Sequence, residues 1–171
     1  MQRSKLKAKD IARYGLMLAL ALVLSWVETL IPIQVAVPGM KIGLANLVVV
    51  TALYELGEKD AFIISTIRIL LVAFTFTGFG PMMYSLAGGM LSCLVMILMK
   101  KMGIFSTTGV SVCGGVSHNI AQIVVAAFML GTSRLVYYLP FLLVSGVVSG
   151  VVIGLLGAEI ARRVHPVFRR V

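Results

Sequence analysis

The sequence is poor in charge, and negative charge is especially scarce. Asp and Glu together number 6 of 171 residues, and all charged residues make up 12%. A water-soluble domain carries about 25% charged residues, so this chain has too few to cover a surface that faces water. Its hydrophobic content is 60% and its mean hydropathy is +1.05. These values exclude an ordinary soluble domain and predict an all-α integral membrane protein.

Cysteine, histidine and aspartate are also rare. The two cysteines, Cys93 and Cys113, lie in apolar segments and are not at a metal or redox spacing. No second histidine or carboxylate stands at ligand spacing from His118, so we expect no metal ion and no cofactor. Asp10 and Asp60 are too far apart in the sequence to hold the metal ions of a diphosphate. The chain also lacks GxxxxGK[ST], the phosphate-binding loop, and we expect that it is not an enzyme.

Six apolar stretches dominate the chain instead. A helix needs about 20 residues to cross the hydrocarbon core of a membrane. The candidates cover about residues 12–33, 41–56, 60–78, 81–99, 108–131 and 136–161. The stretch 41–56 is short and needs Lys41 to extend toward the membrane surface. Because the connections are short, we predict one transmembrane domain over residues 1–171, a compact bundle of six helices.

The placement of positive charge predicts the orientation of the bundle. The net charge is +9, with 15 Lys and Arg residues. If the N-terminus is cytoplasmic, twelve of them lie on the cytoplasmic side and two, Lys41 and Arg134, lie outside. Lys and Arg favour cytoplasmic loops, so we expect a multi-pass cell-membrane protein with both termini in the cytoplasm. The basic ends then contact anionic membrane lipid rather than nucleic acid.

Several polar side chains interrupt the predicted membrane segments. They are Glu28, Asn46, Arg68, His118, Asn119 and Gln122. Such groups are costly in lipid and usually face a bundle interior, a water-filled cavity or a ligand. His118 and Gln122 are four residues apart and share one helical face, with Asn119 at its edge. In the predicted orientation all six lie at middle to outer depth. This indicates a substrate pocket that opens to the outside and is capped by residues 34–41.

Packing is an alternative explanation for some of these residues. Glu28 and Arg68 could neutralise each other across the bundle, and Asn46 could bond to a neighbouring helix. For the HNxxQ cluster we favour ligand contact, because three adjacent polar groups exceed what packing needs. Lys41 or Arg68 would meet the ligand if it is anionic. His118, Glu28 and Arg68 could instead form a proton relay, although the inner half lacks the acidic residue of a complete path.

Small residues recur every four positions in two of the stretches. Gly146, Gly150 and Gly154 share one side of the last stretch, and Gly15 and Ala19 lie in the first. Small residues let helices approach closely in lipid, where no hydrophobic force drives helices together. Packing within the bundle and docking of a partner subunit are both open, and these five residues are our candidates for docking.

Four motifs together resemble one bacterial membrane family. They are PGMKIGLANLVVV (38–50), RILL (68–71), SLAGGMLS (85–92) and GGVSHNIAQ (114–122). Over about residues 10–163 the chain resembles the Gx transporters, also described as heptaprenyl diphosphate synthase component I. That family is similar to the S-components, the substrate-binding subunits of energy-coupling factor (ECF) vitamin transporters.

The resemblance implies a function. S-components are bundles of six helices with cytoplasmic termini, and they capture a vitamin or its precursor from outside in a pocket capped by the first loop. They act with a coupling membrane subunit and ATPase subunits, through a small-xxx-small motif in the first helix. Gly15 and Ala19 stand where an Ala-xxx-Ala pair is typical. The expected function is therefore capture of a small vitamin-like or cofactor-precursor molecule in the bacterial cell membrane.

Two alternatives remain open at this point. One is a non-catalytic membrane partner of polyprenyl diphosphate synthesis, which makes the side chain of quinones. The other is a stand-alone proton-coupled carrier, which would need no ATPase subunits.

Overall fold

The computed structural model describes residues 8–30 and 43–170, and all regular elements in these ranges are helical. The side chains of Lys9, Thr29 and residues 166–170 are not included in this description. The elements are α1 (Ala8–Leu30), α2 (Asn46–Glu55), α3 (Glu58–Val72), the π-helical turn η1 (Ala73–Thr77), α4 (Phe79–Met102), α5 (Thr107–Met129), the 3-10 turn η2 (Ser133–Tyr138) and α6 (Leu139–Arg170). The prediction of an all-α protein is confirmed for the described residues.

Five helical stretches are long and apolar enough to cross a membrane. They run over Asp10–Glu28, Glu58–Thr77, Phe79–Met102, Thr107–Met129 and Ser133–His165. Their outer surfaces carry large apolar side chains, with Leu16, Phe74, Leu98 and Phe128 among the exposed ones. Apolar surface on this scale is unsuited to water and matches the acyl chains of lipid. The chain is therefore built as a membrane protein.

Helix α2 differs from the prediction. The predicted crossing 41–56 is helical over only 10 described residues, Asn46–Glu55, which span about 15 Å of the roughly 30 Å hydrocarbon core. Its residues 48–53 are all buried, and the helix packs against α1, α3 and α6. The prediction of a sixth full-length crossing is therefore not confirmed by the described residues. The apolar run reflects burial within protein rather than contact with lipid.

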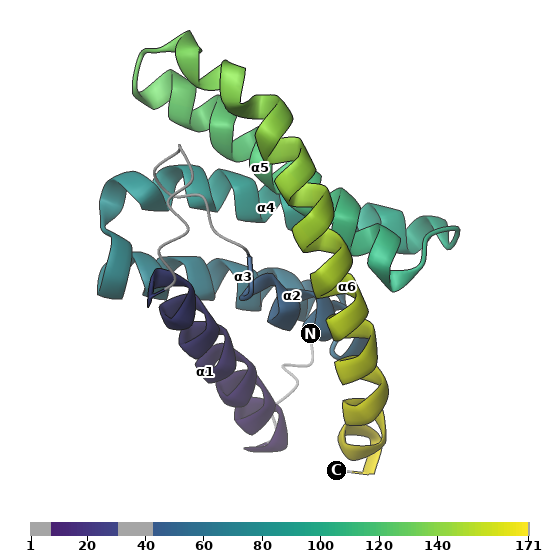
Figure 1. Cartoon of the computed structure of the whole chain (residues 1–171). Coiled ribbons are helices and arrows are strands. Elements are labelled where there is room, and N and C mark those ends of the chain that lie inside the picture. Colours follow the sequence, from purple (N-terminus) through teal and green to yellow (C-terminus); the bar gives the residue numbers. More distant parts are fainter. Residues whose placement is uncertain (1–7, 31–42, 171) are drawn as a thin grey trace, which may run out of the picture.

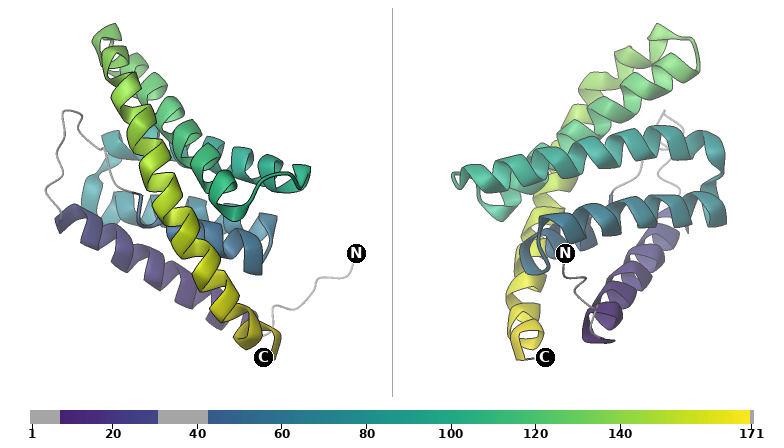
Figure 2. Two further views of the ribbon diagram at one scale, coloured as in Figure 1. Left: turned by 45° about the vertical axis from the view of Figure 1, so that its right-hand side comes forward. Right: turned by 180° about the vertical axis from the view of Figure 1, so that it is seen from behind.

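The long helices pair as antiparallel neighbours (Figures 1 and 2). α3 lies beside α4, and α5 beside α6, so that the α5–α6 hairpin crosses the layer formed by α2, α3 and α4. α1 packs on α3 and α2. The most tightly enclosed side chains come from the middle of this arrangement, with Val49 and Leu53 of α2, Ile64 of α3 and Val110 of α5 each 1% exposed or less. The short helix α2 is therefore at the centre of the hydrophobic core.

Glycines bring the backbones of α5 and α6 into contact. A Cβ atom on Gly150 would lie 2.6 Å from Cα of Val112, and one on Gly154 would lie 2.6 Å from Cα of Thr108. Gly146 is buried in the same interface. Because α5 already occupies this face, Gly146, Gly150 and Gly154 are not available to dock a partner subunit. The alternative of packing within the bundle is the correct one for these three residues.

The first helix keeps its small residues on the outside. Gly15 and Ala19 are exposed on α1, and a Cβ atom on Gly15 would meet nothing within 4 Å. No other described helix covers this position. Docking of a partner through Gly15 and Ala19 stays a prediction.

Most of the charged residues in the described chain lie at or near the helix ends at one end of the bundle. Here α1, α3 and α5 begin and α2, α4 and α6 end. The Nζ atom of Lys101 lies 3.0 Å from Oε2 of Glu58 and joins α4 to α3. Nδ1 of His165 lies 3.0 Å from Oε2 of Glu55 and joins α6 to α2. At the opposite end of the described chain, Arg134 is the one charged residue in the helix connections.

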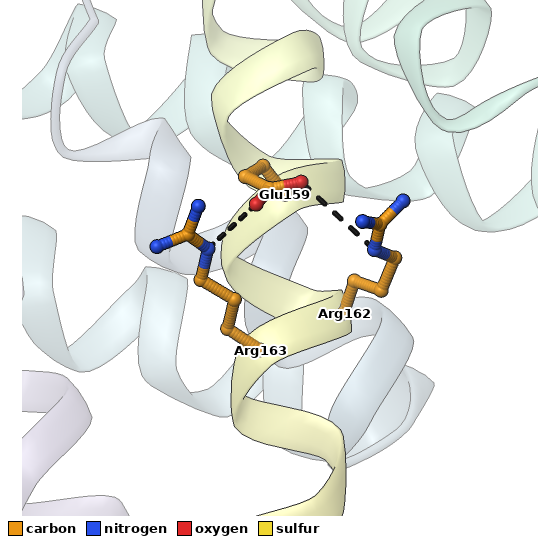
Figure 3. A network of polar contacts seen from close by, with 3 residues as sticks. All are labelled: Glu159, Arg162 and Arg163. Atoms are coloured by element: carbon orange, nitrogen blue, oxygen red, sulfur yellow. Dashed lines mark hydrogen bonds and ion pairs between the residues drawn. The ribbon is translucent and has the colours of Figure 1, made fainter.

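Two further contacts complete the charged end. Lys100 donates through Nζ to the carbonyl oxygen of Leu53 at 2.6 Å, so a cation satisfies a carbonyl in the last turn of α2. On α6, Glu159 pairs with Arg163 at 2.5 Å and with Arg162 at 4.0 Å (Figure 3). Both arginines are exposed, and they present positive charge where the helix leaves the bundle.

Candidate functional site

One cavity is lined by side chains from all six α-helices. The space between these side chains measures about 740 Å³, a volume that includes the part open to solvent. Its walls are Ser25, Glu28, Gly43, Asn46, Arg68, Ile69, Val72, Thr77, Met82, Ser85, Gly115, His118, Asn119, Gln122 and Ser149. Most of these side chains are polar, in a protein whose outer surface is apolar.

The cavity brings together residues that the sequence predicted as a group. Glu28 comes from α1, Asn46 from α2, Arg68 from α3, and the HNxxQ residues from α5. Lys41 and the rest of the predicted cap, residues 34–41, lie outside the described residues. The polar interruptions of the apolar stretches thus face one common space, and their role in binding a ligand stays a prediction.

Helix α5 presents His118 and Gln122 to the cavity on one face. The helix begins at a cap in which the Oγ atom of Ser106 accepts a hydrogen bond from the backbone N–H of Gly109 at 3.2 Å. Opposite His118, helix α4 has Gly88 at a point where a Cβ atom would lie 3.0 Å from Cε1 of the imidazole and 3.0 Å from the His118 carbonyl oxygen. A glycine at this point lets the imidazole pack closely against α4 at the cavity wall.

Asn119 has a second task besides lining the cavity. Its Nδ2 atom donates a hydrogen bond to the carbonyl oxygen of Leu142 on α6 at 2.7 Å. A Cβ atom on Gly146 would lie 2.9 Å from the same Nδ2 atom, so the glycine makes room for the amide. Asn119 therefore ties α5 to α6, a packing role that the sequence argument assigned to Asn46 but not to this residue.

Glu28 is a buried carboxylate near the C-terminal end of α1. Its side chain is 8% exposed, and Oε1 accepts a hydrogen bond from the backbone N–H of Leu44 at 2.6 Å. A hydrogen bond to a charged acceptor is about twice as strong as a neutral one. Glu28 thus fixes the backbone at Leu44, two residues before Asn46 begins α2.

Arg68 is a buried cation on α3. It is 8% exposed, and its Nη2 atom donates to Oδ1 of Asn46 at 3.4 Å, which is long for a hydrogen bond. Its Nε atom is buried and has no hydrogen-bond partner among the described residues. Glu28 and Arg68 attract each other across the cavity, but within the described chain they form no direct ion pair with one another. Neutralisation of the two charges across the bundle and contact of either charge with a ligand both stay open.

Sequence reasoning missed the hydroxyl residues of the cavity. Ser25, Thr77, Ser85 and Ser149 all line it. Serine and threonine carry little signal in a membrane helix because they can bond to their own backbone, as Ser149 does to the carbonyl of Gly146 at 3.4 Å. Thr77 ends the π-helical turn η1, and such turns are frequent at functional sites.

A smaller cavity of about 240 Å³ continues from the main one toward the charged end. The two share Asn46, Gly115 and Ser149, and the smaller one adds Ser92 of α4 and Ser111 of α5. Both of these serines are buried. Polar groups therefore extend deeper into the bundle than the HNxxQ cluster alone indicated.

Metal binding finds no support in the part of the chain that is described. No group of three or more His, Cys, Asp or Glu side chains within residues 8–30 and 43–170 is placed to hold a metal ion. The described side chains of the cavity offer groups for hydrogen bonding and charge pairing.

Comparison with known proteins identifies the family. A family model described as heptaprenyl diphosphate synthase component I matches residues 17–160. The match covers most of the chain, so the chain belongs to this family, and the resemblance drawn from its motifs is confirmed. No curated protein and no solved structure matches. The family description names one component of a synthase, which indicates a membrane subunit that acts with others.

Proposed function

We propose that this member of the heptaprenyl diphosphate synthase component I family is a substrate-binding membrane subunit of an importer of the ECF type. It captures a small vitamin-like or cofactor-precursor molecule from the outer side of the bacterial cell membrane. One observation carries the proposal: a polar cavity of about 740 Å³ lies inside an apolar bundle and is walled by all six helices.

Packing alone does not account for such a cavity. Side chains that only hold helices together are paired with one another, and the space between them is filled. Here polar side chains from six helices surround a space that is partly open to solvent, and the buried Arg68 has an Nε atom with no hydrogen bond among the described residues. Polar groups that face a cavity inside a membrane protein commonly bind a ligand that completes their interactions.

The position of the cavity supports access from outside. Its walls include Glu28 near the end of α1, Thr77 at the end of η1 and Ser85 near the start of α4. These points lie toward the end of the bundle that has few charges, away from the basic end of Lys101 and Arg163. Because basic residues favour the cytoplasm, we assign the basic end to the cytoplasm and the cavity to the outer half.

Energy for import would come from other subunits. The sequence contains no phosphate-binding loop, so ATP hydrolysis belongs to separate ATPase subunits. The exposed Gly15 and Ala19 on α1 offer a position where a coupling membrane subunit could approach closely. Membrane lipid covers the remaining apolar surface.

Native mass spectrometry of the purified protein tests the proposal. We expect a small molecule to co-purify with the wild type and to be lost from Gln122→Ala and His118→Ala. Val124→Ala is the matched control, because Val124 lies on the same helix but is 60% exposed on its outer side. All three variants should stay monodisperse in detergent. If the first two aggregate while Val124→Ala does not, the cluster is structural and the proposal fails.

The family description favours a second candidate, a non-catalytic membrane partner of polyprenyl diphosphate synthesis. This function would use the cytoplasmic end, where Glu159, Arg162 and Arg163 are exposed or partly exposed (Figure 3). It predicts co-purification of a soluble synthase that is lost from Arg162→Glu but kept by Gln122→Ala. Capture of a small molecule predicts instead that the small molecule is lost from Gln122→Ala and kept by Arg162→Glu.

A further inference from the structure

We propose further that the captured molecule is a monocarboxylate and that Arg68 binds its carboxylate group. The inference rests on the proposed function and names the chemical class of the substrate. It starts from the unused hydrogen-bond donors of one buried guanidinium group in the cavity wall, that of Arg68.

The hydrogen-bonding capacity of Arg68 is largely unused by the protein. A guanidinium has five N–H donors in a planar fork. The described residues take up one of them, through the 3.4 Å contact from Nη2 to Asn46, and the buried Nε–H has no partner. Removal of such a cation from water is costly unless an anion and hydrogen bonds replace the water. Among the described residues, no hydrogen-bond acceptor lies next to Nε.

A carboxylate has the geometry that this donor pair needs. Nε–H and a neighbouring Nη–H can donate in parallel to the two oxygens of one carboxylate, which is the preferred recognition mode of arginine. Arg68 is the one Lys or Arg among the residues that line the cavity in the described chain. A ligand with a single acidic group would thus bind at one defined position.

Glu28 limits the negative charge that the cavity accepts. Its buried carboxylate lines the same space and already attracts Arg68. A monocarboxylate brings one negative charge against this pair, whereas a phosphate monoester brings about −1.5 to −2 and a diphosphate brings more. Repulsion from Glu28 therefore favours the carboxylate. The amide and imidazole groups of Gln122 and His118 are then placed to meet polar groups elsewhere on the molecule.

Retention of metabolites from a cell extract tests the inference. Purified wild-type protein in lipid nanodiscs is incubated with a deproteinised extract of bacterial cells, washed and denatured, and the released compounds are identified by mass spectrometry. Arg68→Gln keeps a polar side chain of moderate length but removes the charge, and Arg68→Lys keeps the charge but removes the fork. Arg134→Gln is the matched control, because it makes the same replacement at an exposed arginine outside the cavity.

We expect the wild type and Arg134→Gln to retain the same compound with one carboxylate. Arg68→Gln should retain at least tenfold less of it, and Arg68→Lys an intermediate amount. As a test that needs no variant, the primary amide of the retained acid should bind the wild type at least tenfold more weakly than the acid. This comparison keeps the inference testable if Arg68→Gln does not fold.

The outcomes separate this inference from the proposed function. A retained compound that is neutral, cationic or phosphorylated overturns the carboxylate assignment and leaves capture of a small molecule in place. Equal retention by Arg68→Gln, or equal binding of acid and amide, overturns the role of Arg68. If the wild type retains no compound at all, the proposed capture function itself falls.

Discussion

The contact between α5 and α6 gives a sharp prediction, because it forms one wall of the cavity and depends on a glycine. In Gly150→Ala the new Cβ atom would lie 2.6 Å from Cα of Val112. Carbon atoms in contact are about 3.5–4.0 Å apart. Since the opposing atom belongs to the backbone, no side-chain rotation relieves the clash, and the two helices must separate locally by about 1 Å.

The structure indicates the size of the effect. Overpacking of a close contact costs about 1–3 kcal/mol, and replacement of a helical glycine by alanine returns about 0.5–1 kcal/mol. The net loss is then about 0–2.5 kcal/mol, with a central value near 1 kcal/mol. A loss of about 1 kcal/mol lowers the Tm of a protein of this size by about 2–4 °C. Two turns further along α5, a separation of about 1 Å would also stretch the 2.7 Å bond from Asn119 to Leu142 beyond hydrogen-bonding range.

Thermal unfolding in detergent, with retention of the co-purified molecule, measures both consequences. Gly15→Ala is the matched control, because its Cβ atom would meet nothing within 4 Å, and it should keep or slightly raise the Tm. Gly150→Ala should lower the Tm and reduce the amount of bound molecule. If Gly150→Ala is as stable as Gly15→Ala and binds as the wild type does, the argument that close α5–α6 contact shapes the cavity is refuted.

Three further predictions concern the cavity and the orientation. Asn119→Ala should lower stability by about 0.6 kcal/mol, the average for a hydrogen bond between membrane helices, as measured by unfolding in mixed micelles; an unchanged stability would remove its packing role. Gly88→Ala should push the imidazole of His118 away from α4 and weaken binding severalfold in a titration with the co-purified molecule, whereas equal affinity would show that the imidazole position is unimportant. In a chain whose native cysteines are replaced by serine, Arg134→Cys should react with an impermeant maleimide in intact cells. Lys101→Cys should react only after permeabilisation, and the reverse pattern would invert the proposed orientation.

The long helices could be predicted from the sequence because each one is a long, mainly apolar run with few polar residues. The predicted helix ends lie within a few residues of the observed ones where a glycine ends the helix. Gly103, with φ +72°, does so after α4. Helix α2 could not be predicted in the same way. Hydropathy records that residues 48–53 avoid water, but not whether lipid or other helices surround them.

The cavity residues could be predicted to the extent that their chemistry conflicts with lipid. Charged and amide groups such as Glu28 and Gln122 have few places to lie in a membrane bundle, so depth and helical face were enough to group them. Ser25 and Ser149 carried no such conflict, and their position in the wall depends on how the helices cross. The same crossing decides that Gly150 faces α5 and that Gly15 faces outward, a distinction that the shared four-residue spacing cannot make.

The charges of the molecule also bear on the two candidate functions. A polyprenyl diphosphate head group carries several negative charges and is normally held by metal ions or by several cations. The described cavity wall offers Arg68 opposed by Glu28, and no described cluster of residues is placed for a metal. A role beside a synthase would therefore not use this cavity for the diphosphate. It would use the basic end of the bundle, near Arg162 and Arg163. The two candidate functions use residues at opposite ends of one bundle. A substitution in the cavity should therefore leave binding at the basic end intact, and a substitution at the basic end should leave the cavity intact.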